Sequence, residues 1–86
     1  MTYRQAFYTA LIRTNVDHDF SGALMLCGPF ANGDDAAKYL PAAEKHSRDA
    51  YIIADTDSFA VIGVFMPVLP IGCFNAKLWV DKGKLI

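Results

Sequence analysis

The chain has 86 residues, of which 53% are hydrophobic and 20% are charged, and its formal net charge is −1. This length suits one domain with a modest core, and the apolar content excludes intrinsic disorder. The basic residues are scattered, so we expect no direct binding of nucleic acid, which needs concentrated positive charge. A small domain this apolar often hides part of its surface in an interface, so we expect a protein partner and a homodimer.

The sequence contains two cysteines, Cys27 and Cys73, each in an apolar segment. A small secreted domain held by disulfides would normally contain four or more. We therefore expect two buried free thiols in a reducing compartment. The N-terminal segment has neither the continuous apolar core nor the small-residue cleavage site of a signal peptide. These features together predict a cytoplasmic protein.

Residues 3–14 are compatible with two structures. Tyr3, Phe7 and Leu11 are spaced as on one face of a helix, whereas the middle of the segment is rich in residues that favour strands. The apolar segment 23–27 reads as a short buried strand that could pair with it. We therefore favour a strand for residues 3–14 and keep a helix as the alternative.

A helix is predicted over residues 34–47, after Gly28 and Pro29 stop the preceding strand. Asn32 lies where an N-cap is expected, and acidic residues occupy the first turn, where the helix dipole favours negative charge. Pro41 lies in the interior of this segment. It predicts a kink, or a break after which Pro41 begins a second short helix.

A β-hairpin is predicted next. Residues 50–54 and 59–66 are two runs of strand-forming residues joined by the polar turn 55–58. Residues 77–80 form a last predicted strand. The fold class is therefore α+β: an antiparallel sheet of four to five strands with one kinked helix (34–47) packed on one face. The predicted chain order is β–β–α–β–β–β, or a helix first if the N-terminal segment is helical.

Residues 58–76 contain no charged side chain. A helix of this length would cross a bilayer, so a small membrane peptide is one alternative. The β-branched and aromatic first half instead favours a central strand at 59–66, and Pro67 and Pro70 favour an apolar loop over 67–74. Contiguous exposed apolar residues usually mark an interface, so this loop is a predicted interaction surface. Packing of the loop onto the helix as ordinary core is the alternative.

The full predicted interaction surface combines this loop with the acidic residues of two polar turns. An acidic patch would attract a basic partner. The surface comprises Pro67, Val68, Leu69, Pro70, Ile71, Asp17, Asp19, Asp55 and Asp57.

The sequence contains no diagnostic catalytic or cofactor motif. A small enzyme would use His18 or His46 with a nearby aspartate as an acid–base pair. A cysteine nucleophile is disfavoured because apolar surroundings raise the pKa of a thiol. The aspartates do not have the spacing of a metal-binding loop. We therefore expect a protein that is not an enzyme and uses no cofactor and no metal.

The segment Gly28-Pro29-Phe30-Ala31 and the acidic helix after it resemble the strand-to-helix junction of SPOR domains, which are small α+β domains that bind denuded peptidoglycan glycans. The junction is also similar to those of small uncharacterised phage-encoded proteins. This resemblance covers about thirteen of the 86 residues. It implies a junction in which Pro29 and Phe30 pack the helix onto the sheet.

The leading functional prediction is a non-catalytic protein-interaction module. The resemblance to phage-encoded proteins implies a narrower form, a phage or mobile-element protein that binds and inhibits a host protein. A SPOR-like glycan-binding domain is an alternative. That activity is not carried over, because SPOR domains contain two strand–helix units and one clear helix is predicted for this chain.

Overall fold

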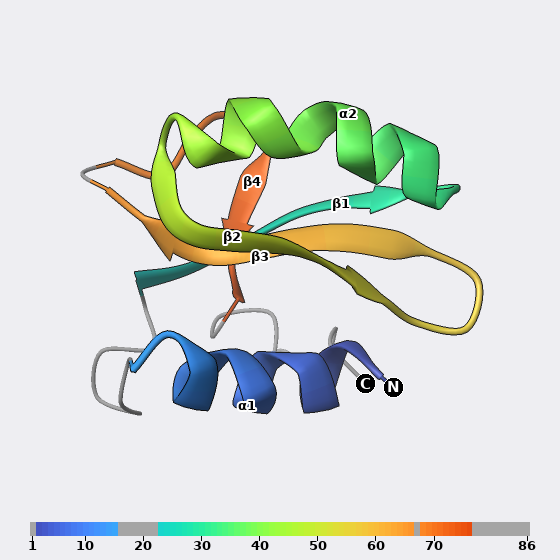
Figure 1. Cartoon of the computed structure of the whole chain (residues 1–86), viewed down its shortest axis with the longest axis horizontal. Helices are drawn as coiled ribbons and strands as arrows, with labels where there is room; N and C mark the ends of the chain where they lie inside the picture. The colour runs from blue at the N-terminus through green and yellow to red at the C-terminus, as the bar shows by residue number, and fades with distance from the viewer. Residues whose placement is uncertain (1, 16–22, 67, 77–86) are drawn as a thin grey trace.

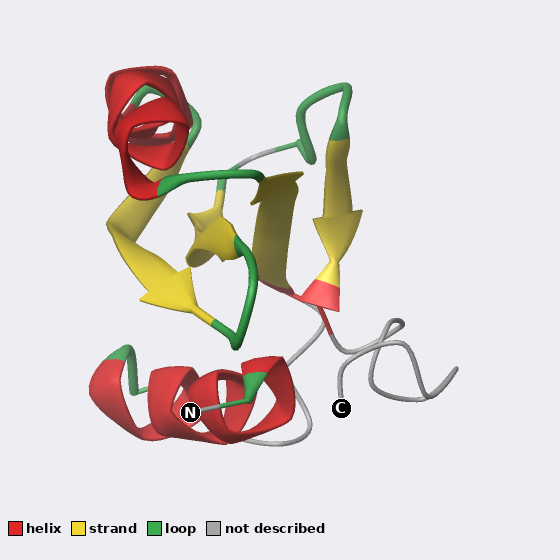
Figure 2. Ribbon diagram, turned by 90° about the vertical axis from the view of Figure 1, so that its right-hand side faces the viewer, coloured by secondary structure: helices red, strands yellow, loops and turns green. Residues whose placement is uncertain are grey.

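The computed structural model describes residues 2–15, 23–66 and 68–76 and contains three layers (Figure 1). The four strands form one antiparallel sheet in the order β2-β3-β1-β4, with a helix on each face (Figure 2). The predicted α+β class with an antiparallel sheet is confirmed. In chain order the elements are α1 (Tyr3–Arg13), β1 (Leu24–Phe30), α2 (Gly33–Glu44), β2 (Ser47–Ala54), β3 (Phe59–Phe65) and β4 (Cys73–Asn75).

The N-terminal segment is a helix, so the favoured strand is wrong and the alternative order with a helix first is confirmed. A capping box starts α1: the Gln5 N–H donates to Thr2 Oγ1 (3.1 Å), and the Thr2 N–H donates to Gln5 Oε1 (2.7 Å). The residues at helical spacing pack on the sheet, and this burial outweighs the strand-forming composition. The prediction of a single helix on one face is therefore also wrong. The buried residues of α1 are Tyr3, Ala6, Phe7, Ala10 and Leu11.

Helix α2 confirms the predicted cap and shortens the predicted range. The Asp35 N–H donates to Asn32 Oδ1 (2.9 Å), as expected of an N-cap. The helix ends at Glu44 instead of residue 47, because the chain turns there into β2. It continues through Pro41, so the predicted break is wrong, while the kink stays a prediction.

The strand-to-helix junction agrees with the prediction for Phe30 but not for Pro29, which is exposed, and β1 does not stop at Gly28. The strand continues to Phe30, with a change of register against β3 between Cys27 and Phe30. The Phe30 ring lies 5.5 Å from the ring of Tyr39 in α2. This contact packs the helix against the end of the strand.

The predicted hairpin is confirmed as β2 and β3, which pair from Ala54↔Phe59 back to Ser47↔Phe65. The pairing is interrupted by a bulge between Arg48 and Tyr51. Asp49 adopts a positive φ of 56° there, a conformation that aspartate tolerates better than most residues. The bulge divides β2 into an irregular first half and a regular second half.

The uncharged run 58–76 contains β3, a connecting loop and β4. The predicted loop over 67–74 is wrong at its end, because Cys73 and Phe74 pair with β1. No helix among the described residues combines the length and apolarity needed to span a bilayer. The predicted strand at 77–80 lies outside the described residues.

The core has one cluster on each face of the sheet. The sheet residues facing α1 include Leu24, Leu26 and Ile62, which are at most 1% exposed. The face toward α2 includes Met25, Cys27 and Val61, which are equally buried. Alternation of side chains along β1 supplies both clusters.

Candidate functional site

The predicted apolar loop is exposed only in part. Val68 is 70% exposed and Ile71 is fully exposed, whereas Leu69 packs against the cluster beneath α2. Pro70 is half-buried. The loop was expected to be either an exposed interaction surface or part of the core, and it is partly both. Leu69 packs in the core, while Val68 and Ile71 form exposed apolar surface. The remaining predicted residues of the loop and of the first acidic turn, Pro67, Asp17 and Asp19, lie outside the described residues.

Leu69→Asp and Ile71→Asp are expected to have different effects on stability. A carboxylate at Leu69 would be placed against the apolar cluster, which we expect to cost about 2 kcal/mol. At Ile71 the carboxylate would remain in water, with a change within about 0.5 kcal/mol. Urea unfolding of both variants measures the difference. Equal destabilisation would show that Ile71 is not a surface residue.

Asp55 has a structural role at the turn between β2 and β3. Its Oδ1 accepts a hydrogen bond from the Thr56 N–H (2.7 Å), and its Oδ2 accepts one from the Tyr3 N–H in the first turn of α1 (3.4 Å). Tyr3 also bonds Ser58 through the two hydroxyl oxygens, which are 2.6 Å apart. The turn is thus attached to the start of α1. Asp57, in the same turn, is exposed.

Acid is expected to weaken this attachment. The hydrogen bond from the Thr56 N–H, followed by that from the Tyr3 N–H, lowers the pKa of Asp55 in the folded protein. Because the pKa of Asp55 is lower in the folded state than in the unfolded state, the ionised carboxylate stabilises the fold above the unfolded pKa of about 4. This stabilisation is lost as the pH falls further through the folded pKa. Asp55→Asn should therefore flatten the fall in Tm between about pH 5 and pH 2. Thermal unfolding across that range measures this, and an unchanged slope would contradict the assignment.

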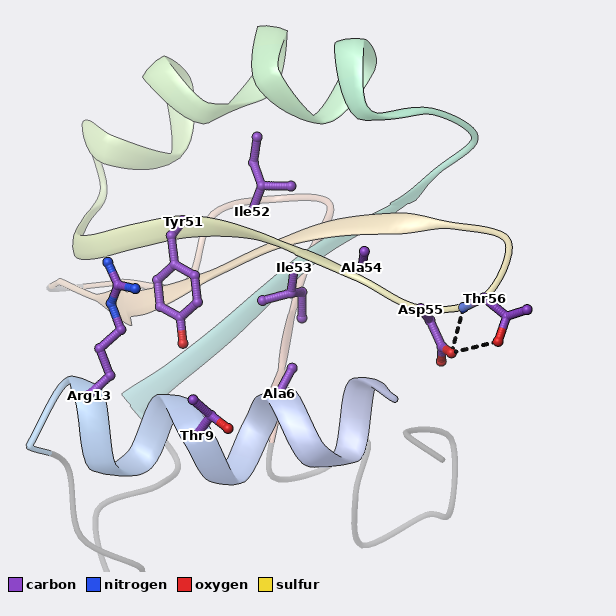
Figure 3. A pocket seen from close by; sticks show the side chains of 9 residues that line it. All are labelled: Ala6, Thr9, Arg13, Tyr51, Ile52, Ile53, Ala54, Asp55 and Thr56. Atoms are coloured by element: carbon purple, nitrogen blue, oxygen red, sulfur yellow. Dashed lines mark hydrogen bonds between the residues drawn. The ribbon is translucent and has the colours of Figure 1, made fainter. Parts of the chain in front are cut away.

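A groove of about 520 Å³ runs between α1 and the regular half of β2 (Figure 3). On the helix side it is lined by Ala6, Thr9 and Arg13, which follow one flank of α1 at helical spacing. The first two side chains are small, so they leave space beside the strand. The volume is in the range of pockets that bind ligands or peptide side chains. The other lining residues are Tyr51, Ile52, Ile53, Ala54, Asp55 and Thr56.

The two ends of the groove carry opposite charges. At one end, the Arg13 guanidinium carbon lies 4.1 Å from the centroid of the Tyr51 ring, a cation–π contact. Asp55 lies at the other end, beyond Ala54 (Figure 3). The Tyr51 hydroxyl oxygen is buried and has no hydrogen-bond partner among the described residues. Burial raises the pKa of Tyr51, while Arg13 has the opposite, smaller effect.

Beside this groove, β2 is an edge strand of the sheet that the described residues form. The Asp55 N–H donates to Ser58 O (2.9 Å), so these two residues form a hydrogen-bonded pair. Hydrogen-bonded and non-hydrogen-bonded pairs alternate along an antiparallel ladder. Ile53 and Tyr51, two and four residues before Asp55, therefore also belong to hydrogen-bonded pairs, and their main-chain groups point toward β3. The N–H and C=O groups of Ile52 and Ala54 point away from β3, toward the open edge.

Only the first half of this edge carries the features that usually prevent strand pairing. Arg48 and Asp49 are exposed charges, and the bulge distorts the strand beside them. The second half, from Tyr51 to Ala54, is regular, uncharged and partly exposed, with Ile52 36% exposed. A regular uncharged edge is a template for another strand.

Sequence reasoning did not select Arg13, Tyr51, Ile52 or Ala54. The change from Arg48-Asp49 to an uncharged strand is visible in the sequence, but it marks an unprotected stretch only once β2 is known to be an edge strand. His18 lies outside the described residues, and His46 lies in the connection between α2 and β2. Within the described part of the chain, no group of three or more histidine, cysteine or acidic residues is arranged to bind a metal.

Comparisons with models of protein families, with curated proteins and with solved structures found no match to this chain.

Proposed function

We propose that this chain is a non-catalytic protein-interaction module, and that the regular half of β2 is the surface through which it binds a second copy of itself. The observation that carries the proposal is the open, uncharged edge from Tyr51 to Ala54 with a groove beside it. Addition of a strand to such an edge gains main-chain hydrogen bonds. The groove then accommodates side chains of the added strand.

The direction of the main-chain groups favours one register for the proposed dimer. In this register the two copies of β2 run antiparallel and are related by a twofold axis between their Ile53 residues. The outward N–H and C=O groups of Ile52 in each copy then face those of Ala54 in the other copy. This register uses every outward N–H and C=O of the regular half. The result is one continuous sheet, in which both α1 helices lie on the same face.

Charge complementarity favours a second copy as the occupant of this edge. In the same register, Tyr51 of one copy lies opposite Asp55 of the other, with Cβ atoms about 5 Å apart. Arg13 lies over Tyr51, so its guanidinium comes beside the carboxylate of the other copy. Asp55 Oδ2 accepts one hydrogen bond within its own chain and has capacity for another. Each dimer therefore contains this Arg13–Asp55 contact twice.

The exposed part of the apolar loop lies near the edge of the sheet opposite β2. Val68 and Ile71 precede β4, which is the edge strand opposite β2. A β2–β2 dimer would therefore present two such loops at its outer ends. Two linked copies of a weak binding surface increase the avidity for a partner that engages both. Binding to a further protein through this loop, including inhibition of a host protein, stays a prediction.

Sedimentation velocity over a range of concentrations tests the proposal. We expect a monomer–dimer equilibrium for the natural chain and a monomer for Ile52→Pro, because proline removes an outward N–H without removing a bond to β3. Ile52→Ala is the matched control, since it shortens the same side chain and keeps the N–H. A natural chain that is monomeric at every concentration, or an Ile52→Pro variant that still dimerises, would overturn the proposal.

A further inference from the structure

The two cysteines, which are 46 positions apart in the sequence, lie opposite one another in the sheet. Cys27 of β1 pairs with Cys73 of β4 in the antiparallel register. Both side chains belong to the cluster beneath α2, so both point to the same face of the sheet. Both thiols are free and buried.

The pair is of the type in which cross-strand side chains approach most closely. The Cys73 N–H donates to Pro70 O (3.2 Å) instead of across the ladder, which marks Cys27↔Cys73 as a non-hydrogen-bonded pair. In such pairs the Cα atoms lie about 4.5 Å apart. A disulfide requires a Cα separation of about 4.4 to 6.8 Å, so this backbone geometry can accept one.

We propose that Cys27 and Cys73 are a modification site, an intramolecular dithiol that a small peroxide converts to a cross-strand disulfide. In the first step a cysteine thiolate attacks one peroxide oxygen, the O–O bond breaks, and a sulfenic acid and hydroxide form. In the second step the other sulfur attacks the sulfenic sulfur and forms the S–S bond. Its thiol proton and the departing hydroxyl leave as water. With hydrogen peroxide, the hydroxide of the first step takes up the proton that the attacking thiol has released, so overall two thiols are oxidised and one hydrogen peroxide is reduced to two waters.

The surroundings indicate which sulfur reacts first. Cys73 is 7% exposed and Cys27 is 1% exposed, so a small oxidant reaches Cys73 more readily. The Tyr39 hydroxyl oxygen lies 3.0 Å from Cys73 Sγ, and this contact orients the thiol beneath α2. Burial, followed by the contact with Cys73, raises the pKa of Cys27 to about 12, so Cys27 stays a thiol at neutral pH. Cys73 therefore forms the sulfenic acid and Cys27 resolves it.

The disulfide would attach the short strand β4 covalently to β1. It would thereby fix the end of the loop that contains Val68 and Ile71. It would also close a long chain segment, which constrains the unfolded state. We expect the Tm to rise by about 10 °C on oxidation, about half of what the entropy of loop closure alone would give.

Treatment of the reduced, folded protein with hydrogen peroxide tests this site. We expect a product lighter by two hydrogen atoms, loss of both free thiols, a peptide pair joined through the two cysteines, and recovery of the starting mass with a reductant. Cys27→Ala is the matched control: without a resolving thiol, its Cys73 should proceed to the sulfinic acid.

Protein unfolded in urea is the second control and does not depend on any variant folding. The proposal is overturned if the folded chain retains both thiols under conditions that oxidise the unfolded chain. It is also overturned if Cys73 of the natural chain accumulates sulfinic acid as fast as it does in Cys27→Ala.

Discussion

Replacing Ile53 with proline is expected to cost at least about 5 kcal/mol, which is comparable to the whole stability of a domain this small, and to leave most of the chain unfolded. The Ile53 N–H points toward β3, so proline removes a ladder hydrogen bond from the interior of the hairpin. The substitution also removes a side chain that is 6% exposed and belongs to the cluster facing α1. The lost hydrogen bond and the lost buried side chain both lower the free energy of unfolding, so their costs add.

Ile52→Pro is the matched substitution one residue earlier. Its N–H points to the open edge, so we expect this variant to stay folded, with a loss of about 1 kcal/mol. Urea unfolding followed by circular dichroism compares the two variants. If Ile52→Pro were the more destabilised of the two, the assignment of outward groups on β2 would be wrong.

The second large effect is expected at Gly63, which lies opposite the bulge of β2. A Cβ atom at this position would lie 3.1 Å from Ala50 Cα and 3.2 Å from Ser47 Oγ. Gly63 is in a strand that is paired on both sides, so the backbone has little room to move away. Gly63→Val should therefore destabilise the fold by about 2 to 3 kcal/mol through overpacking.

The midpoint of urea unfolding measures this cost. Gly63→Ala serves as the comparison, because a single methyl group meets the same atoms without the branched groups of valine. We expect the natural chain with glycine to be the most stable, the alanine variant to be intermediate and the valine variant to be the least stable. A valine variant as stable as the natural chain would show that the bulge does not approach β3 so closely.

The parts of the fold that could be predicted depend on local signals. The hairpin follows from two strand-forming runs and a polar turn, and the start of α2 follows from Asn32 and the acidic residues after it. The N-terminal helix was harder, because strand-forming residues at 7–12 compete with the helical spacing of Tyr3, Phe7 and Leu11. The capping box of Thr2 and Gln5 is a local signal for a helix that the sequence prediction did not use.

The open edge of β2 and the cysteine pair could not be predicted, because both depend on strand order. Nothing local in Tyr51–Ala54 indicates that β3 lies on one side and that the other side is open. Likewise, β4 is too short to have a recognisable pattern and exists through its pairing with β1. That pairing also brings together two cysteines that composition alone assigned as separate buried thiols.

The central claim is that two copies pair through β2 with Arg13 beside Asp55 of the other copy, and a charge exchange tests it most directly. Arg13→Glu and Asp55→Lys each place like charges at both contacts of a homodimer. A mixture of the two restores two attractive contacts, Glu with Lys and Asp55 with Arg13. Sedimentation velocity should show monomers for each variant alone and a heterodimer for the mixture, once thermal unfolding has shown that both are folded. Two folded variants that remain monomeric when mixed, or that each still dimerise alone, would contradict the proposed dimer.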